Sequence, residues 1–179
     1  MCGDDVPASV TLQGGVVRLR AVGAADAPRL TEILADPEVA EWWGRWDLER
    51  VQTELIARDD RDLTVVLAIE ADGEVIGLIQ YLEEEDPEYR SAGIDISVHP
   101  DWHHRGLGAD ALRTLARYLI DERGHHRLTI DPDADNARAI RSYERVGFRP
   151  VGVMRRYSRA PDGRWRDGLL MDLLAEELT

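Results

Sequence analysis

The sequence predicts an α/β fold, with a mixed and mostly antiparallel central sheet flanked by about four helices. Three observations support this prediction. Strand-like segments in the middle of the chain are joined by a tight Asp-Gly turn, which is typical of an antiparallel hairpin. Later segments alternate between strand and amphipathic helix, as in domains whose helices cover a sheet. The 179 residues suffice for one substantial core, so we expect a single domain over residues 15–179.

The N-terminal part is expected to form a tail, a strand and two helices. We interpret residues 1–14 as a flexible N-terminal tail. Alternation over residues 16–21 predicts a strand. The apolar spacing over residues 24–34 predicts a first helix, and a second helix is expected over residues 47–58 with Asp47 as its cap.

Three strands are predicted to form a meander in the middle of the chain. They cover residues 64–70, 74–82 and 91–98, and Asp72-Gly73 supplies the first turn. Residues 83–88 contain five acids in six residues and are interpreted as a loop before the third strand.

The C-terminal part is expected to complete the sheet and its helical cover. A long amphipathic helix is predicted over residues 106–123, followed by a strand over residues 127–130. A second helix is expected over residues 137–146, capped by Asp135 or Asn136. Two closing strands are predicted over residues 148–154 and 168–174.

The charge composition excludes some classes of protein. The chain has 22 basic and 35 acidic residues, and every basic residue is arginine. A chain without lysine lacks the amine that a Schiff-base enzyme or a P-loop nucleotide hydrolase needs. The net charge of −13 argues against a generic nucleic-acid or membrane-surface binder and favours a cationic partner. An acidic surface that serves only solubility is the alternative.

Cysteine usage and hydropathy indicate the compartment. Cys2 is the single cysteine, so no disulfide can form within the chain. No apolar stretch approaches the roughly 20 residues of a membrane-spanning helix, and the N-terminus has no basic region followed by an apolar run. We therefore expect a cytoplasmic protein. The histidines have no recognisable zinc spacing, so we expect no metal.

The most informative local motif lies between a predicted strand and the long helix, over residues 98–108. Gly106 and Gly108 allow close backbone approach, so several amide N–H groups converge where the helix begins. Such a cluster of amides, together with the helix dipole, binds a pyrophosphate without lysine. Arg105 can add a charge-assisted contact. A tight turn in which the glycines serve packing is the alternative.

A second motif covers residues 136–148. Asn136, the only asparagine, precedes the helix, and Phe148, the only phenylalanine, follows its terminating glycine. Tyr143 comes seven residues, or about two turns, after Asn136, so both side chains share one helix face. A polar ligand lying along this face would touch both. The alternative is a helix cap and a core tyrosine.

The two motifs together resemble the GNAT superfamily of acyl-CoA-dependent N-acetyltransferases. Residues 103–108 are similar to its phosphate loop, Gln/Arg-x-x-Gly-x-Gly/Ala, with His103 at the Gln/Arg position, and residues 136–148 match its later block throughout. The resemblance implies a GNAT-type sheet and acetyl-CoA as cofactor, with coenzyme A as product. The cofactor-binding residues that it implies are Ile96, Val98, His103, His104, Arg105, Gly106, Leu107, Gly108, Ala109, Asn136, Ala139 and Tyr143.

Further segments resemble the aminoglycoside 6'-N-acetyltransferases within this superfamily. Glu41-Trp42-Trp43-Gly44 and Gly93-Ile94-Asp95 are the more discriminating ones. The chain departs from that pattern between Tyr81 and Arg90, because members of that group carry a longer, tryptophan-bearing loop at this place. The resemblance implies acetylation of an aminoglycoside 6'-amino group, and hence antibiotic resistance. Two alternatives remain: another amine acceptor (hydroxylysine, a polyamine or a protein N-terminus) or a non-catalytic acyl-CoA-binding module.

The expected chemistry assigns a role to each polar residue of the site. Tyr143 is expected to protonate the leaving thiolate, and Asp95, in preference to Asp131, is expected to be the base. A backbone N–H near Ile96 is expected to polarise the thioester carbonyl. We expect a cationic small-molecule partner and no nucleic acid or membrane, in a monomer or homodimer. The expected substrate-binding residues are Trp43, Gln80, Glu83, Glu84, Asp95 and Asp131.

Overall fold

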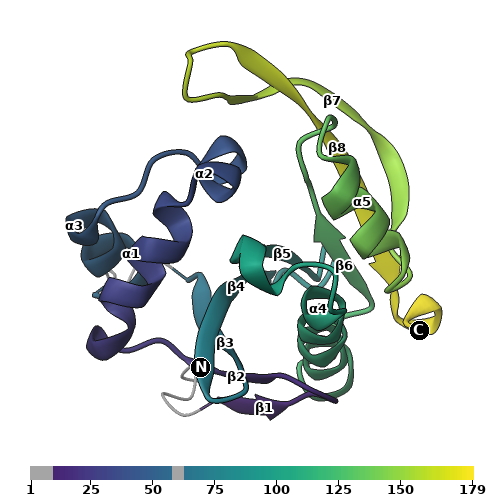
Figure 1. The fold of residues 1–179 in the computed structure, drawn as a ribbon. Coiled ribbons are helices and arrows are strands. Elements are labelled where there is room, and N and C mark those ends of the chain that lie inside the picture. Colours follow the sequence, from purple (N-terminus) through teal and green to yellow (C-terminus); the bar gives the residue numbers. More distant parts are fainter. Residues whose placement is uncertain (1–9, 58–62) are drawn as a thin grey trace.

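The computed structural model describes residues 10–57 and 63–179, and its framework is one eight-stranded sheet (Figure 1). The strand order is β1-β2-β3-β4-β5-β6-β8-β7. Every neighbouring pair is antiparallel except β5 and β6, which run parallel, so the predicted mixed sheet is confirmed. The strands are β1 (Thr11–Gln13), β2 (Arg18–Ala21), β3 (Val65–Ala71), β4 (Glu74–Glu84), β5 (Ser91–Val98), β6 (Arg127–Ile130), β7 (Arg149–Arg159) and β8 (Trp165–Leu174).

Helices cover both faces of this sheet. The α-helices are α1 (Ala27–Ala35), α2 (Pro37–Trp43), α3 (Leu48–Arg50), α4 (Leu107–Arg117) and α5 (Ala137–Glu144). Two of them continue as π-helical turns, α3 over Val51–Ile56 and α4 over Tyr118–Glu122. Short 3₁₀ turns occur at Ala24–Asp26, Pro100–Trp102 and Ala175–Glu177.

The helix α2 was not among the expected helices. Asp36 ends α1 and accepts a hydrogen bond from the Glu38 amide at 2.9 Å, so it also caps α2. Pro37 occupies the first turn, where its missing N–H costs nothing. The end of α1 and the start of α2 therefore coincide at Asp36, and the tryptophan-rich segment that follows begins as a helix.

Alternation along the central strands divides the core into two layers. Val66 and Leu78 pack against α1 and the turn after α3, whereas Leu67 and Ile79 face α4. Figure 1 shows α1 and α3 on one side of the central strands and α4 on the other. The cleft described below opens at the far end of the first layer.

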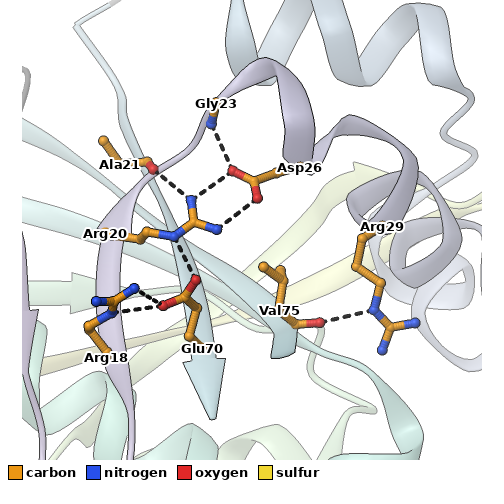
Figure 2. A network of polar contacts seen from close by, with 8 residues as sticks. All are labelled: Arg18, Arg20, Ala21, Gly23, Asp26, Arg29, Glu70 and Val75. Atoms are coloured by element: carbon orange, nitrogen blue, oxygen red, sulfur yellow. Dashed lines mark hydrogen bonds and ion pairs between the residues drawn. The ribbon is translucent and has the colours of Figure 1, made fainter. Parts of the chain in front are cut away.

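A buried polar network holds the first helix against the sheet (Figure 2). The Arg20 guanidinium bridges Asp26, at 2.8 Å, and Glu70, at 2.7 Å, which joins β2, β3 and the turn before α1. The hydrogen bond from Arg20 is the main reason that the pKa of Asp26 is lowered. Arg29 adds a hydrogen bond of 2.9 Å to the Val75 carbonyl in β4.

The expected tail is wrong for part of its length. Residues 1–9 lie outside the described residues, but Thr11–Gln13 pair with β2 as strand β1. The turn between them is held by the Asp110 carboxylate of α4, which accepts hydrogen bonds from the amides of residues 15, 16 and 17 at 3.1, 2.8 and 3.0 Å. A Cβ at Gly14 would lie 2.5 Å from the Thr114 hydroxyl, so this approach requires glycine. The anchor that orders β1 is thus almost a hundred residues away along the chain.

Other boundaries differ at the solvent-exposed ends of strands. The strand β4 extends to Glu84, so Glu83 and Glu84 belong to a strand and not to the expected loop. The strands β7 and β8 form a longer hairpin than expected. The exposed residues of this hairpin have no apolar alternation, and the sequence pattern therefore understated its length.

We predict that Asp110→Ala lowers the free energy of unfolding by about 2 kcal/mol, because three backbone donors lose a charged acceptor. Urea denaturation of both proteins measures the difference. Asp121→Ala is the matched control, since Asp121 is an exposed acid on the turn that continues α4. Equal losses in the two variants would contradict an anchoring role for Asp110.

Candidate active site

The central sheet splits between its two parallel strands. The strands β5 and β6 pair only at Ala92–Leu128 and Gly93–Thr129. Residues 94–98 continue along β4 without a partner in β6, so one edge of β5 is exposed there. A cleft of about 970 Å³, here called the main cleft, opens at this split and extends between α2, α4 and α5.

The glycine loop supplies an open set of amides at one end of the main cleft. Gly106 has φ +76° and begins α4. The amides of Leu107, Gly108 and Ala109 precede the first intrahelical bond, which joins the Asp110 amide to the Gly106 carbonyl at 3.0 Å. These residues line the main cleft, and a Cβ at Gly106 would meet nothing within 4 Å. The geometry fits an anion with several oxygens, such as a pyrophosphate.

His103 connects this loop to the neighbouring elements. Its Nε2 lies 2.7 Å from the Val98 carbonyl oxygen, and its Nδ1 lies 2.5 Å from an Arg138 nitrogen. A guanidinium only donates, so this pattern assigns the proton to Nε2 and leaves His103 neutral. Burial is the main reason that the pKa of His103 is lowered. The side chain that departs from the family pattern thus orients an arginine of α5.

Arginines line the main cleft although the net charge of the chain is strongly negative. Arg138, Arg141 and Arg145 follow one face of α5 and line the main cleft. This helical spacing is present in the sequence, within a chain whose overall composition is acidic. Arg50, Arg159 and Arg166 also line the main cleft.

The expected cofactor-binding residues lie together with one exception. Residues Ile96, Val98, His103, His104, Gly106, Leu107, Gly108, Ala109, Asn136, Ala139 and Tyr143 line the main cleft. Arg105 is not among the residues that line the main cleft, and its phosphate contact stays a prediction. Its guanidinium donates to the Asp101 carbonyl at 2.9 Å and lies 4.8 Å from the centre of the Trp102 ring.

The helix α5 and its cap supply three of these residues, Asn136, Ala139 and Tyr143, and the spacing of Asn136 and Tyr143 places both at the main cleft as expected. Asn136 caps α5 by accepting a hydrogen bond of 3.1 Å from the Ala139 amide, and the residue also faces the main cleft. Tyr143 is buried at the cleft wall, with its ring packed 6.3 Å from that of Phe148. Burial raises the pKa of Tyr143 and the charge of Asp95 raises it further, so the phenol remains protonated.

Two carboxylates face each other across the strand split. Asp95 lies in β5 beyond its last pairing with β6, and Asp131 directly follows β6. Asp95 lines the main cleft and is exposed within it, although the protein atoms around its carboxylate remove part of its hydration. This desolvation raises the pKa of Asp95, and the charge of Asp131 raises it further, although Gln80 donates a hydrogen bond of 3.0 Å to the carboxylate.

Tyr157 is a site residue that the sequence did not reveal. Its hydroxyl donates to the Asp131 carboxylate, and this hydrogen bond is the main cause that raises the pKa of Tyr157 to about 12. A register shift in β7 between Met154 and Ser158 directs the side chain toward Asp131. The strand was expected to end at residue 154, and no sequence signal marks a shift of register.

Two expected substrate-binding residues are elsewhere. Trp43, Gln80, Asp95 and Asp131 line the main cleft, but Glu83 and Glu84 do not. Glu83 lies on the α4 side of β4 with its oxygen 2.6 Å from His125 and 3.0 Å from Arg123. Burial alone would raise the pKa of Glu83, but the hydrogen bonds from Arg123 and His125 outweigh it and lower the pKa.

Glu84 accepts a hydrogen bond of 3.0 Å from the Asp86 amide at the end of the strand. The structure therefore does not place these two acids with the other expected substrate-binding residues. Strand alternation directs Glu83 to the opposite face of the sheet.

The helix α2 forms the wall opposite α5 and is tied across the main cleft by two arginines. Arg166 of β8 donates to the Glu41 carbonyl at 3.1 Å, pairs with Asp133 at 3.5 Å and lies 5.2 Å from the centre of the Trp42 ring. Arg138 approaches Glu38 at 3.6 Å. Figure 1 shows the β7–β8 hairpin, which carries Arg166, extending toward α2.

Within the described parts of the chain, no helix is both long and apolar enough to span a membrane.

Strands that separate beside an amide-lined helix start fit an acyl-CoA-dependent transferase. The family model for the acetyltransferase (GNAT) domain matches residues 17–149, and the chain belongs to this family of acetyltransferases. Enzymes of the family use acetyl-CoA, and the amide cluster at Gly106 together with the arginines of α5 fits its phosphates.

Individual relatives narrow the comparison. Aminoglycoside N(6')-acetyltransferase type 1 of Klebsiella pneumoniae is 31% identical over 174 residues, covering 86% of this chain and 82% of the relative. The structure of AAC(6')-Ib with paromomycin and acetyl-CoA superposes with a TM-score of 0.75 and 27% identity, covering 90% of this chain and 95% of the other. The ribosomal protein bS18-alanine N-acetyltransferase of Escherichia coli K12 is 40% identical over 82 residues, covering 44% of this chain and 52% of the relative.

We predict that Arg166→Ala raises the hydrogen-exchange rates of the α2 amides by about tenfold. The variant loses the hydrogen bond to the Glu41 carbonyl and the contact with the Trp42 ring, which together hold this short helix from across the main cleft. Mass spectrometry of peptides that contain α2 measures the change. Arg164→Ala is the control, because Arg164 is 81% exposed and pairs with Asp162 at the hairpin tip. Unchanged hydrogen-exchange rates of the α2 amides in Arg166→Ala would contradict the role of Arg166 in holding this helix.

Proposed function

We propose that this acetyltransferase transfers an acetyl group from acetyl-CoA to the 6'-amino group of aminoglycoside antibiotics, and thereby confers resistance in the cytoplasm. The observation that carries the proposal is the Asp95–Asp131 pair at the strand split, beside a wall that contains Trp42 and Trp43. Two carboxylates suit a polycation, and indole rings suit a sugar face or a bound amine. The K. pneumoniae relative supports this choice of acceptor.

The cofactor is proposed to bind along the open edge of β5. The amides of Leu107, Gly108 and Ala109 would hold its pyrophosphate, and Arg138 would add charge from α5. Backbone groups of Ile96 and Val98, which have no partner in β6, would receive the pantetheine arm. When bound, acetyl-CoA supplies an activated acetyl thioester.

Proton transfers are assigned to two side chains. The acceptor ammonium must lose a proton before its nitrogen can attack, and the Asp95 carboxylate receives that proton directly or through water. Its raised pKa makes Asp95 a stronger base than an ordinary aspartate. Tyr143 remains protonated and donates its hydroxyl proton to the thiolate sulfur when the C–S bond breaks.

Turnover on a panel of amines tests the function. Purified protein with acetyl-CoA should release free thiol with 6'-amino aminoglycosides and not with analogues that carry a 6'-hydroxyl. A polyamine and a peptide that begins with the N-terminal residues of bS18 complete the panel, since a relative acts on that protein. No turnover on any 6'-amino compound, or faster turnover on the peptide, would defeat the proposal.

We predict that Asp95→Asn lowers kcat/KM by at least about tenfold, which is the low end for the loss of an acid–base group. Below its raised pKa Asp95 is protonated and cannot accept a proton, so wild-type kcat/KM should fall as the pH falls through that pKa. The variant should lose this acidic limb of the pH profile.

Asp72→Asn is the matched control, because Asp72 occupies a hairpin turn with φ +52°, which asparagine also adopts. It should retain both the rate and the profile. An unchanged acidic limb in Asp95→Asn would remove Asp95 from the role of base.

A further inference from the structure

A second cavity of about 350 Å³ lies at the closed end of the strand split. This cavity is called the side cavity here. The residues that line it and not the main cleft include Leu82, Gly93, Thr129 and Leu170. We propose that the side cavity binds the ring that carries the reacting amine of the acceptor, while the amine itself lies between Asp95 and the cofactor. This inference rests on the proposed function and deepens it by locating the body of the acceptor.

The side cavity is continuous with the main cleft. Gln80, Asp95, Asp131 and Tyr157 line both of them. A molecule with its amine beside the two carboxylates therefore has free volume for the atoms that carry the amine. The size lies within the range of about 300–1000 Å³ that is typical of small-molecule sites.

The volume of the side cavity depends on the absence of a side chain at residue 93. Gly93 and Thr129 form the last pair of β5 and β6 before the strands separate. A Cβ at Gly93 would meet only the Thr129 hydroxyl, at 3.6 Å, which is an ordinary contact. Gly93 does not have a positive φ, so its backbone does not require glycine. A larger residue would fit the strand and fill the space.

The main cleft and the side cavity differ in the charged residues that line them, as do the anionic cofactor and the cationic acceptor in their charge. Six arginines and five carboxylates line the main cleft, whereas the described residues that line the side cavity include Asp95 and Asp131 and no arginine or histidine. A cationic acceptor is therefore better placed against the described walls of the side cavity than against the arginines of the main cleft. Gln80, Thr129 and Tyr157 offer polar atoms, and Leu82 and Leu170 offer apolar surface, which suits a hydroxylated ring.

Substitution of Gly93 tests the inference directly. Gly93→Ala and Gly93→Val fill the side cavity in two steps, and Gly152→Val is the matched control. Gly152 lies on strand β7, outside both cavities, and a Cβ there would meet nothing within 4 Å. Kinetics are measured with a 6'-amino aminoglycoside, with methoxyethylamine as an acceptor without a ring, and with acetyl-CoA. Calorimetry gives the Kd of the aminoglycoside for the CoA-loaded protein.

We expect Gly93→Val to raise both the KM and the Kd of the aminoglycoside by about tenfold or more, with a smaller rise for Gly93→Ala. Both the kcat/KM for methoxyethylamine and the KM for acetyl-CoA should stay within about twofold of wild type, and Gly152→Val should match wild type. The alanine variant preserves the test if the valine variant does not fold.

Three outcomes would overturn the inference: unchanged aminoglycoside constants, an equal loss with both amines, or a change confined to the KM for acetyl-CoA. Failure of the proposed function has a different signature, which is wild-type inactivity toward every 6'-amino compound. In that case the amine of the panel that is acetylated replaces the aminoglycoside, and either an acceptor without a ring or an unchanged KM in Gly93→Val overturns the inference.

Discussion

The site depends on one structural constraint, the early separation of the parallel strand pair in an otherwise antiparallel sheet. The strands β5 and β6 share two residue pairs, and β6 is only four residues long. Because β5 continues without a partner in β6, its backbone and Asp95 are exposed inside the domain and not at its rim. The helices α4 and α5 then begin on either side of the opening, so the amides of one and the Asn136–Tyr143 face of the other reach the same space.

The opening also separates charges that would otherwise interfere. A chain with a net charge of −13 would repel an anionic cofactor if its acids were spread evenly. Arginines are instead concentrated along the cleft face of α5 and on the β7–β8 hairpin, and carboxylates occupy the point where the strands part. Acids outside the site are neutralised locally, as Glu83 is by Arg123. Net charge is therefore a poor guide to the potential that a ligand meets.

The sequence was sufficient for those parts of the fold and site that depend on local pattern. The glycine loop, the Asn136 cap, Tyr143 and Asp95 all lie within short motifs whose spacing sets their positions, and each lines the main cleft. Features that arise from contacts between distant segments were missed. Tyr157 reaches Asp131 through a register shift, β1 is held by Asp110, and Arg166 ties α2 from across the cleft. The position of Glu83 was missed for the same reason, since a strand two residues longer than expected decides which face its side chain takes.

The two carboxylates at the split are not equivalent, and their neighbours explain the division of labour. Asp131 accepts the hydroxyl of Tyr157, whose raised pKa keeps that proton on the phenol. One oxygen of the Asp131 carboxylate therefore already accepts a hydrogen bond. The negative charge of Asp131 acts on Asp95, the neighbouring carboxylate. Asp95 instead accepts a hydrogen bond from the neutral amide of Gln80, and its charge raises the pKa of Tyr143 more than the charge of Asp131 does. Desolvation and the charge of Asp131 both raise the pKa of Asp95, so the proton of an incoming ammonium is better received there than on Asp131.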